Sequence, residues 1–212
     1  MECIFCREKS RSSYRCTKGH YVCDRCYRMG AEDLIEYTTT RSTSDNPFII
    51  AEPLLEAPVI RLHGPEHHFL VPAVLIAALY NHTRQQDRKE RCIRAARRRA
   101  DLVKGGFCGM MGDCGAALGT GIFVSVIAGA TPMSQEEWRL SNLVTGRTLE
   151  EIALYGGPRC CKRNTFLALR SAVRFLEKEM HIRLPMPETI RCRFGARSQD
   201  CVREKCPFYT GS

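Results

Sequence analysis

The pattern of apolar and polar positions predicts a mainly α-helical protein. Residues 69–80 are almost continuously apolar, which predicts a buried helix over 72–82 with Pro72 in its first turn. An amphipathic helix is predicted over 85–103, ending at a Gly-Gly pair that can reverse the chain. The longest helix is predicted over 162–181. One face of it carries an apolar stripe formed by Phe166, Leu169, Val173, Leu176 and Met180.

Two further patterns predict shorter elements. The sequence S/T-x-x-E occurs at Ser134 and at Thr148, and it marks a helix start because the hydroxyl and the carboxylate satisfy free backbone amides. Two short helices are therefore expected, ending near Leu143 and Tyr155. Residues 49–62 combine prolines with alternating apolar positions, which favours an extended segment or an edge strand.

Composition turns attention to the thirteen cysteines. A chain of 212 residues with 44% hydrophobic content can bury a core without needing disulfides. Its first residues have neither the basic nor the apolar region of a secretory signal, so a reducing, cytoplasmic location is expected. There, clustered cysteines indicate metal ligation or redox chemistry. Residues 114–135 lack charge but are strongly apolar only in their middle, which predicts a buried helix and no membrane association.

The amino end contains two Cys-x-x-Cys pairs, Cys3 with Cys6 and Cys23 with Cys26. Two residues between thiolates let both sulfurs reach one tetrahedral ion at a tight turn. With the segment 19–22 leading into the second pair, this end resembles a zinc ribbon or the first half of a RING finger. A closed site of four thiolates has no open position, so it predicts a structural zinc that supports folding.

Cys16 and His20 stand where a RING finger takes ligands for a second ion. The resemblance implies a second zinc, and Cys201 with Cys206 would complete it if the two chain ends fold together. The alternative is that Cys16 and His20 only pack or hydrogen-bond beside a single structural zinc.

Four more thiols lie in glycine-rich surroundings at Cys108, Cys114, Cys160 and Cys161. The last three are expected at helix amino termini, where the positive end of the helix dipole favours a thiolate. Four thiolates suit a 4Fe-4S cluster, while a zinc ion or a dithiol-disulfide couple would use the same residues. The adjacent pair could instead supply one ligand and one exchange-active thiol.

These residues, read as Cys108, then Gly112-Asp-Cys114-Gly-Ala-Ala-Leu-Gly119, then Cys160 and Cys161, resemble the family named after its C-GCAxxG-C-C signature. They are also similar to uncharacterised archaeal and bacterial cysteine-rich domains found with methyltransferases. The likeness covers residues 64–207, with an Asp inside the signature and an adjacent final pair as departures. It implies redox or iron-sulfur chemistry and a redox or methyltransferase partner protein.

Three residues are candidates for proton transfer beside the catalytic thiols Cys160 and Cys161. His67 and His68 stand at a helix start and could transfer a proton or bind a metal, or only cap and pack. Asp113 lies inside the cysteine loop, as a carboxylate partner to the sulfur site or as a helix cap.

The carboxyl end carries Cys192, Cys201 and Cys206, one thiol fewer than a closed site requires. Candidates for the fourth ligand are Cys92, Cys16 and His20. The group is expected to be a zinc staple that fixes the terminus, or a second cluster with a free coordination position.

The expected architecture is a helical domain with a small amino-terminal zinc-knuckle module and a cysteine-rich tail. Its four parts are a zinc-ribbon-like module over 1–36, a linker or extended segment over 37–63, a helical cysteine-centred domain over 64–190 and a tail over 191–212.

The leading functional interpretation is a metal- and thiol-dependent redox protein or enzyme component, such as an oxidoreductase or a component of sulfur or methyl transfer. It would hold zinc at the amino end and a 4Fe-4S cluster at the central cysteines. The alternative is a zinc-stapled adaptor that binds nucleic acid or a protein through the basic helix. The net charge of +9 allows this, but no aromatic residues interleave with the basic ones, so a solvated helix face is favoured.

Overall fold

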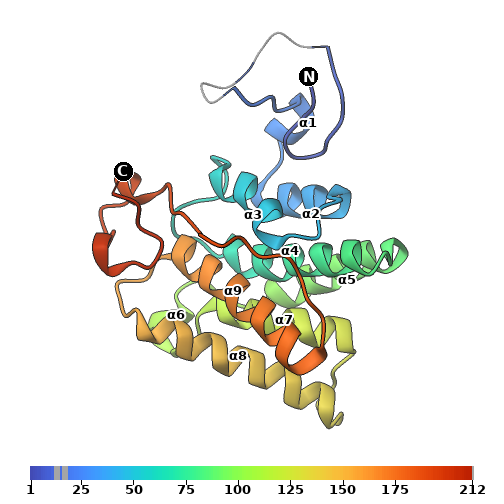
Figure 1. Ribbon diagram of the computed structural model, residues 1–212, viewed down its shortest axis with the longest axis vertical. Helices are drawn as coiled ribbons and strands as arrows, with labels where there is room; N and C mark the ends of the chain where they lie inside the picture. The colour runs from blue at the N-terminus through green and yellow to red at the C-terminus, as the bar shows by residue number, and fades with distance from the viewer. Residues whose placement is uncertain (12–14, 16–18, 212) are drawn as a thin grey trace.

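The computed structural model describes residues 1–11, 15 and 19–211, and this part of the chain is mainly helical (Figure 1). The mainly α fold class is confirmed: within the described residues the β-type contacts are isolated bridges, Glu2 with Lys9 and Cys3 with Tyr21. In chain order the elements are α1 (Asp24–Tyr27), α2 (Ala31–Arg41), α3 (Pro47–Glu56), α4 (Glu66–His82), α5 (Gln86–Ala100), α6 (Phe107–Met110), α7 (Gly115–Ala128), α8 (Glu136–Leu154), α9 (Cys161–Met180), η1 (Gly195–Arg197) and η2 (Arg203–Lys205).

Helix α4 is the centre of the body, because α2, α3, α5, α7 and α9 all pack against it. It is buried on every side from Phe69 to Tyr80, as expected for a helix enclosed by others. The predicted start at Pro72 is wrong, since the helix begins at Glu66 and Pro72 lies inside it. The proline leaves the carbonyl of His68 without its usual helical amide partner, and this carbonyl lies against Gly119 of α7.

Helix α8 is one continuous helix that packs against α7 and α9, so the prediction of two short helices is wrong. The Ser134 hydroxyl bonds to the backbone of Thr131 before the helix begins. Thr148 lies inside the helix, where its buried hydroxyl bonds to the Val144 carbonyl and to Ser171 of α9. The Thr148 pattern therefore does not begin a helix, whereas α8 begins at Glu136, two residues after Ser134, with Gln135 as its N-cap.

Helices α2 and α3 occupy most of the segment predicted as a linker or extended chain. The expected edge strand is wrong, because Pro47 takes the first position of α3 and Asn46 caps it by accepting from the amides of Phe48 and Ile49. Phe48 and Leu54 are buried, so α3 belongs to the core. The division into four domains stays a prediction.

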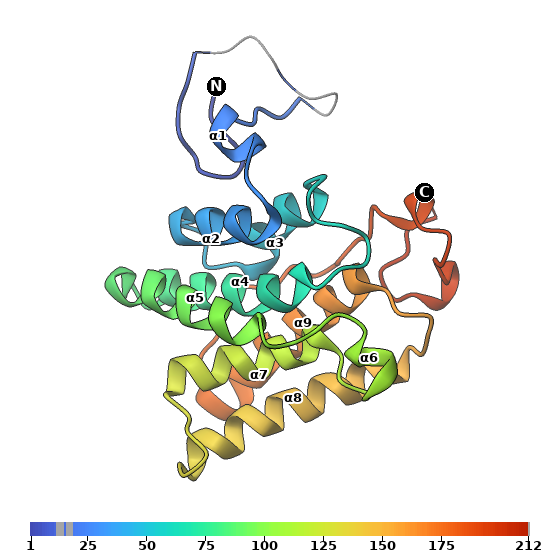
Figure 2. The same ribbon diagram turned by 180° about the vertical axis from the view of Figure 1, so that it is seen from behind.

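The two ends of the chain lie at different places on this body. Figures 1 and 2 show the amino-terminal residues and α1 above α2, while the carboxyl-terminal tail lies beside the start of α9. Phe208 fixes the tail there, with its ring edge-to-face on Phe166 at 5.5 Å and its carbonyl accepting from the Cys192 amide at 2.7 Å. No helix in the described residues is long and apolar enough to cross a membrane.

Candidate metal and sulfur sites

The amino-terminal cysteines form the most compact cluster of possible metal ligands in the described part of the chain. The sulfurs of Cys3, Cys6, Cys23 and Cys26 all lie within 4.8 Å of one another. The Cys6 and Cys23 sulfurs are 3.8 Å apart. Four thiolates about 2.3 Å from a zinc ion would be separated by about 3.8 Å in a tetrahedron, so the spacing matches.

Local backbone structure produces this cluster. The first pair lies in a turn closed by the Arg7 amide, which donates to the Cys3 carbonyl at 3.0 Å. Cys23 precedes α1, and its amide donates to the Cys3 sulfur at 3.4 Å. Burial opposes ionisation of Cys3, but backbone amides led by that of Cys23 lower the pKa of its thiol to about 7. Burial raises the pKa of Cys6 to about 11. Several thiolates are stable here only with a cation, so the cluster fits a metal-binding module.

The other residues suggested for a RING-like second ion lie in different parts of the chain. Cys16 lies outside the described residues, and His20 is exposed. Cys201 and Cys206 line a pocket on the tail, with Cys160. The second ion suggested by the RING resemblance therefore stays a prediction.

That pocket, which we call the tail pocket, lies between the start of α9 and the tail. Four cysteines line it: Cys160, Cys192, Cys201 and Cys206. Cys160 is therefore a further candidate for the fourth thiol of the tail group. Of the residues suggested for that role, Cys92 is buried in the core with its sulfur 3.5 Å from the Tyr80 hydroxyl. The adjacency of Cys160 and Cys161 in the sequence could have indicated this. Adjacent side chains at a helix start point in different directions, so the two thiols were not expected to face the same site.

Backbone amides face two of the four sulfurs. The Arg163 amide lies 3.4 Å from the Cys160 sulfur, and the Phe194 amide lies 3.4 Å from the Cys192 sulfur. Even so, burial raises the pKa of Cys160, Cys161 and Cys192 in the metal-free chain. The expectation that the start of α9 favours the thiolates of the adjacent pair is therefore wrong without a bound cation, because desolvation outweighs the amides.

Two residues that line the same pocket each have a buried side-chain nitrogen without a hydrogen-bond partner in the described part of the chain. The buried side-chain nitrogens without a hydrogen bond among the described residues are His63 Nδ1 and Arg163 Nη1, and both residues line the tail pocket. Lys162 also lines it, with its ammonium group 5.0 Å from the centre of the Phe194 ring. An unpaired buried polar atom is costly, so a polar occupant of the pocket that bonded to either nitrogen would relieve that cost.

The central cysteines divide between two places. Cys160 belongs to the tail pocket, whereas the Cys114 sulfur accepts a hydrogen bond at 3.3 Å from Asn164, one turn after Cys161. Cys108 is half-buried on α6 and makes no hydrogen bond to the residues that the structure describes. No group of three among these thiols matches the compactness of the amino-terminal cluster.

Asp113 and His67 have different surroundings. The Asp113 side chain does not cap α7, whose N-cap is Cys114. His67 is buried, and its ring nitrogens bond to the Thr165 hydroxyl at 2.9 Å and to the Arg61 carbonyl at 3.0 Å. Burial lowers the pKa of His67 to about 4. Both ring nitrogens of His67 are engaged within the core, which favours the packing alternative for this residue.

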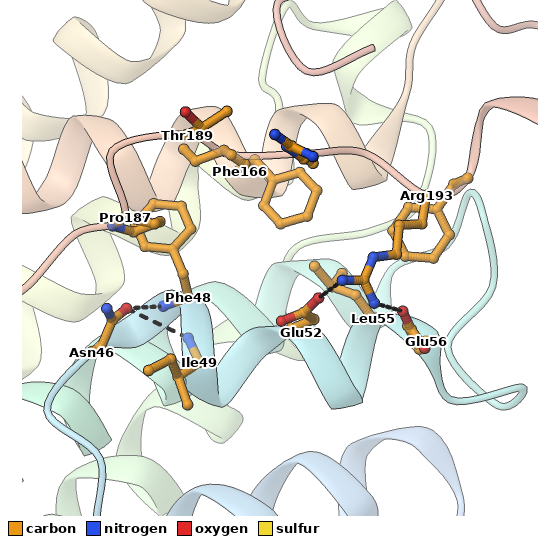
Figure 3. Close-up of a pocket in the computed structure, with 13 residues that line it drawn as sticks. Asn46, Phe48, Ile49, Glu52, Leu55, Glu56, Phe166, Pro187, Thr189 and Arg193 are labelled. Atoms are coloured by element: carbon orange, nitrogen blue, oxygen red, sulfur yellow. Dashed lines mark hydrogen bonds and ion pairs between the residues drawn. The ribbon is translucent and has the colours of Figure 1, made fainter. Parts of the chain in front are cut away.

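A larger pocket of about 310 Å³ lies between α3 and the segment 187–194 (Figure 3). Phe48 and Phe166 face its interior, and Arg193 closes one side through ion pairs with Glu52 and Glu56. Phe194 lines both this pocket and the tail pocket, so the two are neighbours. Its volume is in the range of small-molecule sites.

Two arginines of the basic helix α5 form ion pairs with its neighbour α2. Arg97 pairs with Asp33 and Glu36 at 2.8 Å each, and Arg94 pairs with Glu36 at 3.2 Å. Lys89 is buried and donates to the backbone of Ser42. These contacts reduce the positive charge that α5 offers to a phosphate backbone.

Comparison with known families adds the context for these sites. A family of unknown function, DUF5714, matches residues 35–209, which is most of the chain. The chain belongs to the DUF5714 family. The match includes the tail pocket and begins after the amino-terminal cysteine cluster. No curated protein and no solved structure matches this DUF5714 protein. The resemblance to the C-GCAxxG-C-C family stays a prediction.

Proposed function

We propose that this DUF5714 protein is a metal- and thiol-dependent redox protein, with an iron-sulfur cluster of the 4Fe-4S type held by Cys160, Cys192, Cys201 and Cys206. The observation that carries the proposal is that these four cysteines line one pocket. Such a cluster transfers single electrons, and its potential depends on hydrogen bonds to the sulfurs. The amino-terminal cluster would hold zinc in a structural role.

Three features of the pocket support a cluster over a single ion. The four sulfurs are less compact than the amino-terminal group, which has the spacing for one zinc. The Arg163 and Phe194 amides face two of them. The unpaired guanidinium nitrogen of Arg163 would offer a further donor to an anionic cluster. The free pocket is only about 20 Å³, so the tail, which is irregular around its two short 3₁₀ turns, would move outward to admit it.

Anaerobic reconstitution with iron and sulfide tests this proposal. The wild-type chain should bind about four irons and four sulfides and absorb broadly in the visible region. Cys206→Ser and Cys192→Ser should lose most of the iron and the colour. Cys108→Ser is the matched control, because Cys108 is also half-buried but lies outside the pocket.

Two outcomes would overturn the assignment. A colourless protein that holds only zinc after reconstitution would exclude the cluster. Loss of iron in Cys108→Ser with retention in Cys206→Ser would return the cluster to the set Cys108, Cys114, Cys160 and Cys161. The adaptor alternative predicts salt-sensitive retention on nucleic acid, and the pairing of Arg94 and Arg97 with α2 favours the redox proposal over it.

A further inference from the structure

The pocket of about 310 Å³ beside α3, which we call the α3 pocket, has an aromatic interior (Figure 3). Phe48 and Phe166 face this interior, and Phe194 lines it from the segment between α9 and η1. All three rings are buried, as is Leu55 in the same lining. Such a lining favours an aromatic ligand, because rings bury a large apolar area and pack well in offset-stacked or edge-to-face pairs.

Of these rings, that of Phe48 is open to a ligand. Phe166 packs edge-to-face on Phe208 at 5.5 Å, and the Lys162 ammonium lies 5.0 Å from the centre of the Phe194 ring. The Phe48 ring has no aromatic or cationic partner among the described residues. A flat ring against Phe48 would therefore make a contact that the chain itself does not make.

The chain segment before η1 supplies polar groups to the α3 pocket. The lining includes every second residue of it: Pro187, Thr189, Arg191 and Arg193. Alternate side chains of an extended chain share one face. Cys192, between the two arginines, lines the tail pocket instead. The segment therefore offers two guanidinium groups and one hydroxyl to the α3 pocket.

The two arginines differ in their surroundings. Arg193 lies between two carboxylates of α3, 3.2 Å from Glu52 and 3.3 Å from Glu56. Arg191 is exposed, and its side chain forms no ion pair or hydrogen bond with a described residue. A cationic ligand would have to displace Arg193 from both carboxylates, whereas an anionic ligand meets Arg191 without a competitor. The net charge of +9 also attracts anions to the protein.

We propose that the α3 pocket binds a small aromatic carboxylate. Its ring lies against Phe48, and its carboxylate accepts hydrogen bonds from the Arg191 guanidinium and the Thr189 hydroxyl. The volume is near the lower end for small-molecule sites, which fits an acid of one or two rings. The proposal rests on the α3 pocket alone and does not depend on what the tail pocket holds.

Three probes with one carbon skeleton and different charges test the site. Cinnamate, cinnamamide and cinnamylamine are anionic, neutral and cationic at neutral pH, and each is titrated into the full-length protein by calorimetry. Cinnamate should bind one molecule per chain, at least about tenfold more tightly than cinnamamide, because only the carboxylate pairs with a guanidinium. Cinnamylamine should bind most weakly. Added salt should weaken cinnamate binding and leave cinnamamide binding unchanged, because Arg191 is exposed to screening.

Two variants separate the charge from the ring. Arg191→Met keeps an apolar stem, and it should weaken cinnamate by about tenfold without changing cinnamamide. Arg183→Met is the matched control, because Arg183 is also exposed and follows α9 but lies outside the α3 pocket, paired with Glu177. Phe48→Leu should weaken both probes, since it removes the ring and leaves the charge.

Several results would overturn the proposal. One is a wild-type protein that binds no cinnamate, or that binds cinnamate and cinnamamide equally well. Tighter binding of cinnamylamine would assign the pocket to a cation held by Glu52 and Glu56. An Arg191→Met protein that binds cinnamate as the wild type does would also exclude the assigned contact. The comparison of the three probes uses the native chain, so it decides the question even if Phe48→Leu fails to fold.

Discussion

Replacement of Gly115 by alanine tests the close packing of His68 against α7. The new β-carbon would lie 2.0 Å from Cδ2 of His68 and 2.5 Å from its Cγ. Because Cγ is close to the backbone, a small tilt of the ring does not remove the overlap. The ring must leave its place, and its hydrogen bond to the Val103 carbonyl is lost with it.

The expected cost follows from these two effects. Overpacking typically costs about 1–3 kcal/mol, and a lost hydrogen bond costs about 1 kcal/mol. Alanine recovers at most about 1 kcal/mol over glycine in a helix. We therefore expect Gly115→Ala to lower the free energy of unfolding by about 2 kcal/mol. For a chain of this size, that corresponds to a fall in Tm of about 4–8 °C.

Gly146→Ala is the matched control, because Gly146 lies within α8 and an added β-carbon there meets nothing within 4 Å. This variant should gain about 1 kcal/mol from helix propensity alone. Thermal unfolding of the zinc-loaded proteins, followed by circular dichroism, measures both changes. If Gly115→Ala is as stable as Gly146→Ala, the His68 ring does not occupy the space beside Gly115, and the reasoning fails.

Three further predictions concern the core, alkaline pH and metal removal. Thr148→Val should lower the free energy of unfolding, measured by urea denaturation, by about 1–2 kcal/mol, because the buried Ser171 hydroxyl loses a hydrogen-bond partner. An unchanged midpoint and slope of the urea transition would contradict this. Burial and the Cys92 thiol raise the pKa of Tyr80 to about 12 from 10.0, so the unfolded chain ionises first and the native state loses stability as pH rises between these values. Tyr80→Phe should lose less stability than the wild type over that interval, and parallel curves would refute the assignment. Cys26→Ser, or removal of zinc, should expose residues 1–29 to protease while the circular-dichroism signal of the helical body persists. The reason is that the metal supplies the folding energy of the amino-terminal module. Loss of most of the helical signal would show that the body depends on the bound metal.

Local sequence pattern predicted the helices whose apolar positions follow one regular stripe. The helix expected over 162–181 is observed as α9 (Cys161–Met180), because one continuous face packs on the core. The sequence pattern gave a wrong helix boundary where one residue type can serve two structural roles. A threonine hydroxyl satisfies a helix start or bonds within a helix equally well, and tertiary contact with Ser171 decided the second for Thr148.

The candidate sites were predictable only in part, because their geometry depends on distant chain segments. The spacing of Cys3, Cys6, Cys23 and Cys26 led directly to one compact cluster, since its turns are local. The partner of the tail cysteines depends on how the tail returns to α9, which the contact of Phe208 with a distant helix determines. His67 and His68 are equivalent in the sequence. Both rings bond to a backbone carbonyl, and the additional bond from His67 to the Thr165 hydroxyl is what engages both nitrogens of His67.

The adjacency of Cys160 and Cys161 links the two places that these residues face. Consecutive α-carbons are separated by about 3.8 Å, well within the distance over which charges interact in physiological salt. An ion bound on one side therefore changes the electrostatic free energy of an ion on the other. By thermodynamic reciprocity, each occupant alters the affinity for its neighbour by the same factor. If both places bind an ion, the loading of one would therefore report on the state of the other.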